Sequence, residues 1–277
     1  MEYLGMRDQA DLYYQKSGEG TELVMLHGWK ASSDVYLKVS ELLSDRYTCI
    51  SYDCRGHKRS GVTGAPDLSV LAEDLNEVIG KLCTGKPVLI GWSMGGLTAL
   101  EYIRKYGCEG ISGLILVDVA PKMRKDETWP CGTYSDDEFY ADQQVMQEIF
   151  FAFLRQYYIR QVPGYAEKTL QEQWERVRTR SMDFDLEAMK SLWISLSNGD
   201  YRGELKNITV PTEIFSAEKQ TCCPTEAAAF YQTHIAADTK IVLFQNASHE
   251  LIVEQPDEFA RQVCLFLESE AVRFQEK

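Results

Sequence analysis

A serine in a glycine-rich turn is the residue of this chain best suited to nucleophilic chemistry. Ser93 is the centre of a Gly-x-Ser-x-Gly segment over 91–95, which directly follows the apolar run 88–90 and precedes a helical pattern. A sharp strand-to-helix turn exposes the serine hydroxyl above a sheet, and side chains at Gly91 and Gly95 would clash across such a turn. The helix N-terminus adds positive potential and free N–H groups. The segment therefore predicts a serine that attacks a carbonyl carbon.

A hydroxyl needs a neighbouring base to become a nucleophile, and His249 is the best candidate. It follows the last apolar run, 240–244, and precedes the terminal helical pattern. This position puts His249 on the same edge of a parallel sheet as Ser93. The chain order, with the serine early and the histidine late, is typical of Ser-His catalysis on α/β sheets.

The other three histidines are assigned different roles. His27 is expected to shape the turn after its strand through hydrogen bonds to the backbone. His57 lies beside Arg55 and Lys58 in the sequence, and their charges are expected to lower its basicity. His234 has no motif around it and is expected at the surface. None of the three is expected to be the base.

Short apolar runs that alternate with helical patterns must position these groups. The runs are apolar on both parities and are bounded by Gly, Asp or Pro, as parallel strands buried on both faces are. These runs are residues 23–26, 47–52, 87–91 and 113–118, and further strand patterns return at 212–215 and 240–244. A helical pattern over 68–82 has apolar residues at three- and four-residue spacing. This alternation predicts an α/β fold with a mostly parallel central sheet flanked by helices.

Residues 122–205 interrupt the alternation, because they contain no convincing strand pattern. Their local patterns are an acidic loop at 136–138 and, after an aromatic-rich stretch, two helical patterns at 166–180 and 185–197. An insertion of roughly 80 residues is too long for a plain loop. We therefore expect an α/β core of residues 1–121 and 206–277 and an inserted helical domain over 122–205. The last helix is expected from 256 to about 273.

The composition of this 277-residue chain excludes several classes of protein. There are 29 Lys and Arg against 42 Asp and Glu, a net charge of −13, so nucleic acid and anionic membranes are not expected partners. No apolar run is long enough to span a membrane, and the N-terminus has no signal-peptide pattern. The eight cysteines are expected to be thiols in a cytoplasmic protein. The chain has no Cys-x-x-Cys pair, and the adjacent Cys222-Cys223 with only four histidines makes a poor zinc site, so no metal is expected. No other cofactor is expected.

Four segments together resemble the α/β-hydrolase fold superfamily, and the resemblance covers nearly the whole chain. They are His27-Gly28-Trp29, Asp53-Cys54-Arg55-Gly56-His57-Lys58-Arg59-Ser60 (with Lys58 where glycine is usual), the segment around Ser93, and Ala247-Ser248-His249 followed by Glu254-Gln255-Pro256-Asp257-Glu258-Phe259. The resemblance implies an oxyanion hole formed by the backbone N–H groups of Trp29 and Met94, which would stabilise negative charge on a carbonyl oxygen. It also implies that 122–205 form a helical cap over the site.

The resemblance leaves two candidates for the acid of a Ser-His-acid triad. In much of the family it follows the strand that matches 212–215, but Gln220 stands at that position here, and an amide lacks the charge that stabilises an imidazolium. Asp118 ends the run 113–118, a place that some members of the superfamily use. Glu218 is the carboxylate nearest to Gln220 in the sequence. We expect Asp118 to be the acid, with Glu218 as the alternative.

A serine hydrolase is the function that these residues favour. Ser93 would attack an ester, thioester or lactone of a small to medium apolar molecule, and His249 would move the proton. The alternative is a cofactor-free dioxygenase that opens hydroxyquinolone rings. Members of that group resemble this chain in their fold, their His-Gly-Trp loop and an acid after the sixth strand, although they tend to have histidine beside the serine, where Trp92 and Met94 stand here. A non-catalytic binding protein on the same fold is the third hypothesis, which no sequence feature favours.

Overall fold

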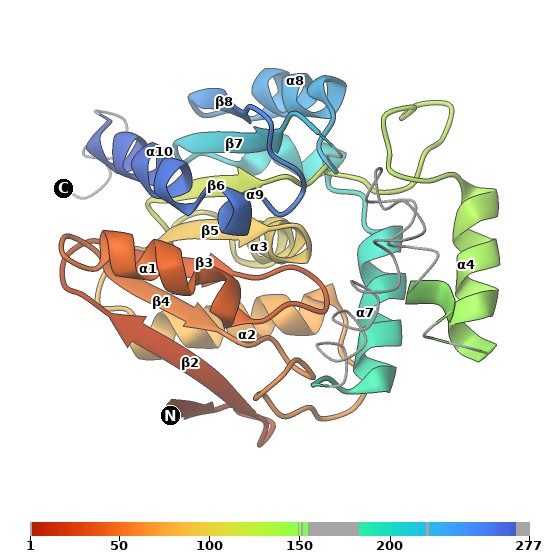
Figure 1. The fold of residues 1–277 in the computed structure, drawn as a ribbon, viewed down its shortest axis with the longest axis horizontal. Coiled ribbons are helices and arrows are strands. Elements are labelled where there is room, and N and C mark those ends of the chain that lie inside the picture. Colours follow the sequence, from red (N-terminus) through yellow and green to blue (C-terminus); the bar gives the residue numbers. More distant parts are fainter. Residues whose placement is uncertain (1, 149, 151, 155–182, 220–221, 270–277) are drawn as a thin grey trace.

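The core of the molecule is an eight-stranded sheet (Figure 1), seen in a computed structural model that describes residues 2–148, 150, 152–154, 183–219 and 222–269. The strands lie in the order β1-β2-β4-β3-β5-β6-β7-β8. β1 and β2 pair in antiparallel fashion, and the pairs from β4 to β8 are parallel. The strands are β1 (Glu2–Gly5), β2 (Asp11–Ser17), β3 (Glu22–Leu26), β4 (Thr48–Tyr52), β5 (Val88–Trp92), β6 (Gly113–Val117), β7 (Thr212–Ala217) and β8 (Thr239–Phe244). The expected mostly parallel α/β sheet is confirmed.

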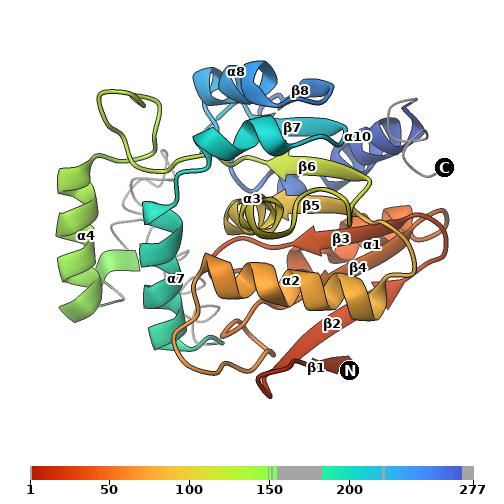
Figure 2. The ribbon, with the colours of Figure 1, turned by 180° about the vertical axis from the view of Figure 1, so that it is seen from behind.

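Helices cover both faces of this sheet, as Figures 1 and 2 show from opposite sides. One face carries α1 (Leu37–Leu43), α9 (Leu251–Glu254) and α10 (Pro256–Glu268), and the other carries α2 (Leu68–Leu82), α3 (Met94–Tyr106) and α8 (Thr225–His234). Strand side chains alternate between the two cores: Leu23 and Met25 join the α1 and α10 core, and Val24 and Leu26 join the α2 and α3 core. The parallel strands are therefore apolar on both parities because both of their faces are buried.

Helix α2 shows how a local signal sets a helix boundary. The side chain of Asp67 accepts a hydrogen bond from Val70 N at 2.8 Å, which satisfies an N–H group that the first turn leaves without a partner. Leu71 and Leu75, one turn apart, are buried against the sheet. The helix over 68–82 predicted from the sequence is confirmed.

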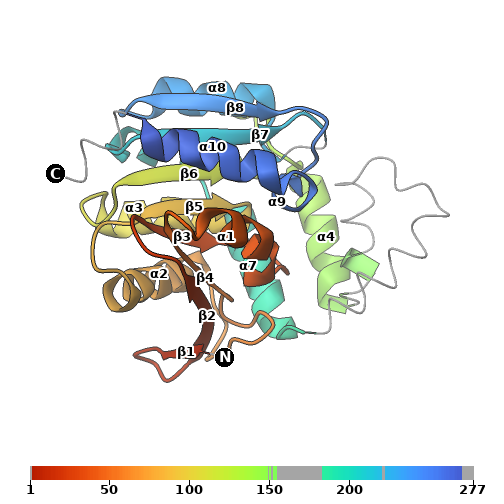
Figure 3. The same cartoon turned by 60° about the vertical axis from the view of Figure 1, so that its left-hand side comes forward.

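Between β6 and β7 the described residues form α4 (Asp136–Glu148), α7 (Leu186–Asn198) and the short 3-10 helix η2 (Arg202–Asn207). Both α4 and α7 lie beyond the ends toward which β6 and β7 point (Figures 1 and 3). The helix expected near 185–197 is confirmed by α7, whereas the pattern at 166–180 lies outside the described residues.

The prediction of an acidic loop at 136–138 is wrong, because these residues form the first turn of α4. Ser135 and Glu138 cap this helix reciprocally: Glu138 Oε2 accepts from Ser135 N at 2.7 Å, and Ser135 Oγ accepts from Glu138 N at 3.3 Å. Carboxylates are stabilised in a first turn by the N–H groups and the dipole of the helix. The acidic cluster is therefore a helix start.

The sequence did not predict β1, β2, α1 or α8. Strand β2 exposes both of its ends and has polar residues over its second half, so it lacks the continuous apolar run of a central strand. The terminal helix α10 ends at Glu268, before the expected 273. No helix in the described ranges has the length and apolar character needed to cross a bilayer. The eight cysteines form no disulfide.

Candidate active site

Ser93 lies in the turn between β5 and α3, at the carboxyl end of β5. Its φ of 55° and ψ of −119° are backbone angles that residues other than glycine rarely adopt and that cluster at functional sites. Ser93 N donates to Val117 O at 3.0 Å, which ties the turn to the neighbouring strand β6. The side chain is partly exposed. The sharp, strained turn that the Gly-x-Ser-x-Gly segment predicts is therefore present.

Glycines make this turn sterically possible. A Cβ on Gly91 would lie 2.6 Å from Gly95 O, and a Cβ on Gly95 would lie 2.2 Å from Leu26 O. Both distances are shorter than Cβ contacts in real structures. The predicted clash across the turn is confirmed for Gly91, whereas a side chain at Gly95 would clash with strand β3. Gly28 approaches from the loop after β3, where a Cβ would lie 3.2 Å from Ser93 Cβ. The loop that was expected to form the oxyanion hole thus lies directly against the serine.

His249 and Asp118 come together at the same edge of the sheet. Asp118 follows β6, His249 follows β8, and Asp118 Oδ2 lies 2.6 Å from His249 Nδ1. The carboxylate is fully buried and accepts backbone hydrogen bonds from Ala217 N to Oδ1 at 3.2 Å and from Cys222 N to Oδ2 at 2.9 Å. These donors fix the carboxylate, so that one oxygen meets Nδ1 and leaves Nε2 available for proton transfer.

The surroundings of His249 favour its charged form. Burial alone would lower the pKa of the imidazole, but the neighbouring Cys222 and the hydrogen-bonded Asp118 raise it, and the pKa of His249 lies well above its ordinary value. A carboxylate bonded to Nδ1 stabilises the imidazolium that forms when a base takes up a proton. The arrangement is suited to a group that gains and returns a proton during a reaction.

Trp92 joins the serine turn to the histidine loop. Its indole Nε1 donates to His249 O at 2.8 Å, and the two rings lie 5.3 Å apart between centroids. No hydrogen bond connects Ser93 Oγ with His249 among the described contacts. Contacts between a nucleophile and its base are often long without substrate and tighten when it binds. The sequence interpretation missed this role of Trp92, whose only signal was its place beside Ser93.

Of the two residues expected to form the oxyanion hole, one is next to Ser93 in the chain and the other is next to Gly28, which lies against Ser93. Met94 is the first residue of α3, where backbone N–H groups have no partner within the helix. Trp29 follows Gly28 in the adjacent loop, and its indole Nε1 donates to Met189 O in α7 at 3.0 Å. The Trp29 ring also lies 6.2 Å from the ring of Phe150 and 6.1 Å from that of Phe153. The loop beside the serine is therefore tied to the inserted segment.

Two buried histidines form hydrogen bonds with the backbone of this loop. His27 Nδ1 donates to Gly28 O at 2.8 Å and Nε2 accepts from Cys54 N at 2.9 Å, as expected of a histidine that shapes its turn. His57 Nε2 accepts from Lys30 N at 3.1 Å, and the two imidazole rings lie 4.9 Å apart. Both rings must stay neutral to accept these bonds.

The low basicity of His57 is confirmed, but its expected cause is wrong. Burial, followed by the neighbouring His27, lowers the pKa of His57 to about 3. The adjacent Arg55 pairs with Asp8 and Asp74, and Lys58 pairs with Asp34, so neither cation is the cause. Desolvation rather than charge keeps this imidazole neutral.

The remaining candidates lie away from the imidazole of His249. Glu218 is exposed and accepts from Asn246 N at 2.7 Å, so it supports the loop that leads to His249. Gln220, at the position where the family resemblance implies an acid in many members, is outside the described residues. His234 is exposed at the end of α8, as expected. Of the two proposed acids, the structure brings Asp118 to His249.

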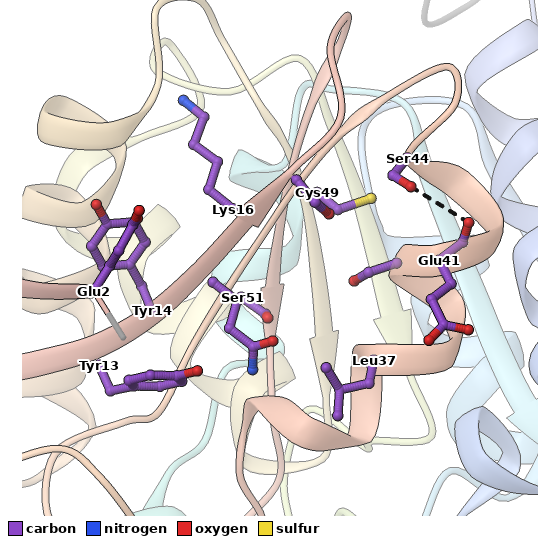
Figure 4. A pocket seen from close by; sticks show the side chains of 12 residues that line it. Glu2, Tyr13, Tyr14, Lys16, Leu37, Glu41, Ser44, Cys49 and Ser51 are labelled. Carbon is purple, nitrogen blue, oxygen red and sulfur yellow. Dashed lines mark hydrogen bonds between the residues drawn. The ribbon is translucent and has the colours of Figure 1, made fainter.

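A separate pocket of about 380 Å³ lies between α1 and the strands β2 and β4 (Figure 4). Labelled residues that line it include Tyr13, Lys16, Glu41 and Cys49. Burial raises the pKa of the Cys49 thiol to about 12, so this sulfur is not a thiolate nucleophile at neutral pH. The pocket holds none of the residues around Ser93 and is not the candidate active site.

Known proteins resemble the chain over its length. A sequence model described as the alpha/beta hydrolase family matches residues 23–262. A pimeloyl-[acyl-carrier protein] methyl ester esterase from Nitrosospira multiformis is 28% identical, over 93% of this chain and 98% of the relative. A putative non-heme chloroperoxidase from Synechocystis is 29% identical, over 79% and 81%. The solved structure of an esterase from Exiguobacterium antarcticum has a TM-score of 0.83 at 27% identity, over 96% and 99%. Because the family model covers most of the chain and the fold agrees, the protein belongs to the alpha/beta hydrolase family.

Proposed function

We propose that the protein hydrolyses a carboxylic ester through an acyl-enzyme on Ser93. The broad activity, hydrolysis of a carboxylic ester, follows from the family and from the esterases that the chain resembles. The acyl-enzyme on Ser93 is supported by the 2.6 Å contact between His249 Nδ1 and Asp118 Oδ2, on the same edge of the sheet as the strained Ser93. Hydroxyl, imidazole and carboxylate in this order are the parts of nucleophilic acyl transfer.

The reaction proceeds in two proton-coupled steps. His249 Nε2 takes the hydroxyl proton as Ser93 Oγ attacks the carbonyl carbon, and Asp118 stabilises the imidazolium. The imidazolium then gives this proton to the departing alcohol, which leaves an acyl group on Ser93. His249 then deprotonates a water that attacks the acyl carbon, and the imidazolium returns this proton to Ser93 Oγ as the acid is released. The negative charge on the carbonyl oxygen is stabilised by the backbone N–H groups of Trp29 and Met94.

The substrate class is a small to medium molecule with an apolar acyl part. The ring of Trp29, in the loop beside Ser93, lies near the rings of Phe150 and Phe153, and its indole donates to Met189 O in α7. We propose that residues 122–205 cap the site. The net charge of −13 disfavours a strongly anionic substrate. Because the Nitrosospira relative is named for a methyl ester, methyl esters belong in the test, beside thioesters and lactones. A cytoplasmic location is supported by the cysteine thiols.

One observation favours a second function, that of the cofactor-free dioxygenase. The acid that contacts His249 follows β6, as the resemblance to that group implies. In that chemistry His249 would deprotonate a substrate hydroxyl and Ser93 would not form a covalent bond. Ester hydrolysis is the stronger proposal because Ser93 keeps the strained turn of a nucleophile.

The two functions are separated by measuring both reactions on the same protein. Wild type and Ser93→Ala are assayed with p-nitrophenyl esters, methyl esters, thioesters and lactones, and oxygen uptake is followed with a hydroxyquinolone. We expect ester turnover by the wild type alone, and labelling of the wild type alone by a fluorophosphonate. Oxygen uptake without ester turnover would establish the dioxygenase instead.

A further inference from the structure

Three side chains of metal-binding type converge beside the proposed catalytic pair. One ligand atom each from Asp118, Cys222 and His249 lies within 4.8 Å of the other two. Asp118 and Cys222 are buried and His249 is partly buried. The proposed reaction uses the carboxylate and the imidazole, and the Cys222 thiol forms no bond to the substrate in it. The sequence could not reveal this cluster, because the three residues come from the ends of β6 and β8 and from the loop before α8.

Both His249 and Cys222 contact the same oxygen of the cluster, Asp118 Oδ2. Asp118 Oδ2 lies 2.6 Å from His249 Nδ1 and also accepts a hydrogen bond from Cys222 N at 2.9 Å. The backbone of Cys222 is thus fixed on the oxygen that faces the imidazole, and its sulfur is held near both partners. A thiolate, an imidazole nitrogen and a carboxylate oxygen are each ligands that zinc accepts, and zinc is almost always tetrahedral in structural sites.

We propose that Asp118, Cys222 and His249 bind a zinc ion, and that this ion switches off ester hydrolysis. The fourth position is left to water. Tetrahedral zinc with ordinary bond lengths separates such ligand atoms by about 3.3–3.5 Å. The shortest contact, 2.6 Å, must therefore open by less than about 1 Å, and the longest, which is no more than 4.8 Å, must close by no more than about 1.5 Å. His249 lies in a loop at the sheet edge, with 23% of its side chain exposed, so its ring can make this adjustment.

Zinc binding and the active form of the base exclude each other. Zinc would form bonds to Cys222 Sγ, His249 Nδ1 and Asp118 Oδ2, while the thiol proton and the Nδ1 proton leave to solvent. No electron is transferred. Nδ1 would no longer donate to Asp118, and a metal-bound imidazole is a weaker base. Zinc binding rests on the geometry alone, whereas the loss of activity also rests on the proposed function.

The ligand set selects the kind of cation. Thiolate and imidazole favour zinc and cadmium, whereas magnesium and calcium prefer oxygen ligands. We therefore expect inhibition by micromolar zinc or cadmium, reversal by a chelator, and no inhibition by the same concentration of magnesium.

Binding is tested with cadmium chloride, because a cadmium–thiolate bond gives an ultraviolet charge-transfer band whether or not the enzyme is active. We expect one cadmium per chain in the wild type and in Ser93→Ala. The band should disappear in Cys222→Ala and in Cys222→Ser, of which the serine variant preserves side-chain size if the alanine variant folds poorly. Cys223→Ala is the matched control, since its sulfur is not part of the cluster, and it should keep the band. A band of equal size in both Cys222 variants, or no band in the wild type, would overturn the proposal.

Inhibition is then measured with zinc chloride, each variant being compared with its own metal-free rate. We expect the wild type and Cys223→Ala to lose at least nine-tenths of their activity at saturation, and Cys222→Ser to need at least about tenfold more zinc. Zinc that fills the site with one ion per chain and leaves the ester rate unchanged would uphold the metal site and refute the role of His249. Equal zinc sensitivity of wild type and Cys222→Ser would overturn the proposed site.

Discussion

Replacing Asp118 with Asn tests the proposed acid most directly, because the structure predicts how the amide will sit. Among the described contacts, Oδ2 accepts from His249 Nδ1 and Cys222 N, and Oδ1 accepts from Ala217 N. An Asn keeps one oxygen and replaces the other with an NH2 donor. The orientation that preserves two hydrogen bonds places the amide oxygen at Oδ2 and the NH2 group against Ala217 N.

This orientation keeps the tautomer of His249 but removes the negative charge. Charged hydrogen bonds are about twice as strong as neutral ones and contribute about 1.5–3 kcal/mol. Losing this contribution, together with the Coulomb attraction between imidazolium and carboxylate, removes about 3 kcal/mol of transition-state stabilisation, which corresponds to about a hundredfold in rate. The opposite orientation would force the wrong tautomer, for which a loss of about 10⁴ is known in a serine protease triad. The expected loss for Asp118→Asn is therefore at least about a hundredfold.

The assay is kcat/KM with a p-nitrophenyl ester, measured on variants whose far-ultraviolet circular dichroism and thermal unfolding show that they are folded. Glu218→Gln is the control, since its amide oxygen can still accept from Asn246 N, and we expect less than a threefold change. A folded Asp118→Asn within tenfold of the wild type would refute the reasoning. A larger loss in Glu218→Gln than in Asp118→Asn would transfer the role to Glu218.

Three further predictions follow from the same region. Ser93→Ala should lower kcat by at least about 10³ while the melting temperature changes little; ester turnover within tenfold of the wild type would exclude Ser93 as the nucleophile. Gly95→Ala should lower the free energy of unfolding by about 1–3 kcal/mol in denaturant titrations, because its Cβ would meet Leu26 O at 2.2 Å, whereas Gly203→Ala, whose Cβ would have open space, should change it little; equal effects would contradict the packing argument. The pKa of His57 is about 3 in the folded chain and about 6.5 in the unfolded chain, so between pH 6.5 and pH 3 only the unfolded chain binds this proton. The free energy of unfolding should therefore fall by about 1.4 kcal/mol for each pH unit of acidification from this group. His57→Gln should show a shallower fall, and parallel curves for the two proteins would count against the buried neutral imidazole.

The sequence predicted those strands, helices and turns whose signal lies within a few neighbouring residues. The central strands are recognisable because their two buried faces make them continuously apolar, and α2 begins where the Asp67 side chain caps it. Ser93 is recognisable because Gly91 and Gly95 are required within a few residues of it. The edge strand β2 escaped prediction because its second half is polar and open to solvent.

The parts of the site that the sequence could not predict depend on distant contacts. The cations next to His57 in the sequence pair with Asp8, Asp74 and Asp34 instead, so adjacency in the chain misidentified the cause of its low basicity. Asp118 was expected to be the acid because Gln220 stands where much of the family has one. Its contact with His249 depends on the pairing of β6, β7 and β8. The thiol of Cys222 beside this pair had no local signal.

The contact between Asp118 and His249 has a consequence for how the molecule folds. The two residues are 131 positions apart, and Trp92 and His249 are 157 apart. Contacts of such long range close large loops and form late, because the entropy of loop closure is lost before they contribute stability. The base cannot reach its carboxylate until β7 and β8 have joined β6 in the sheet. A chain still being synthesised, with its last strand not yet released, would therefore be inactive even though Ser93 was already in place.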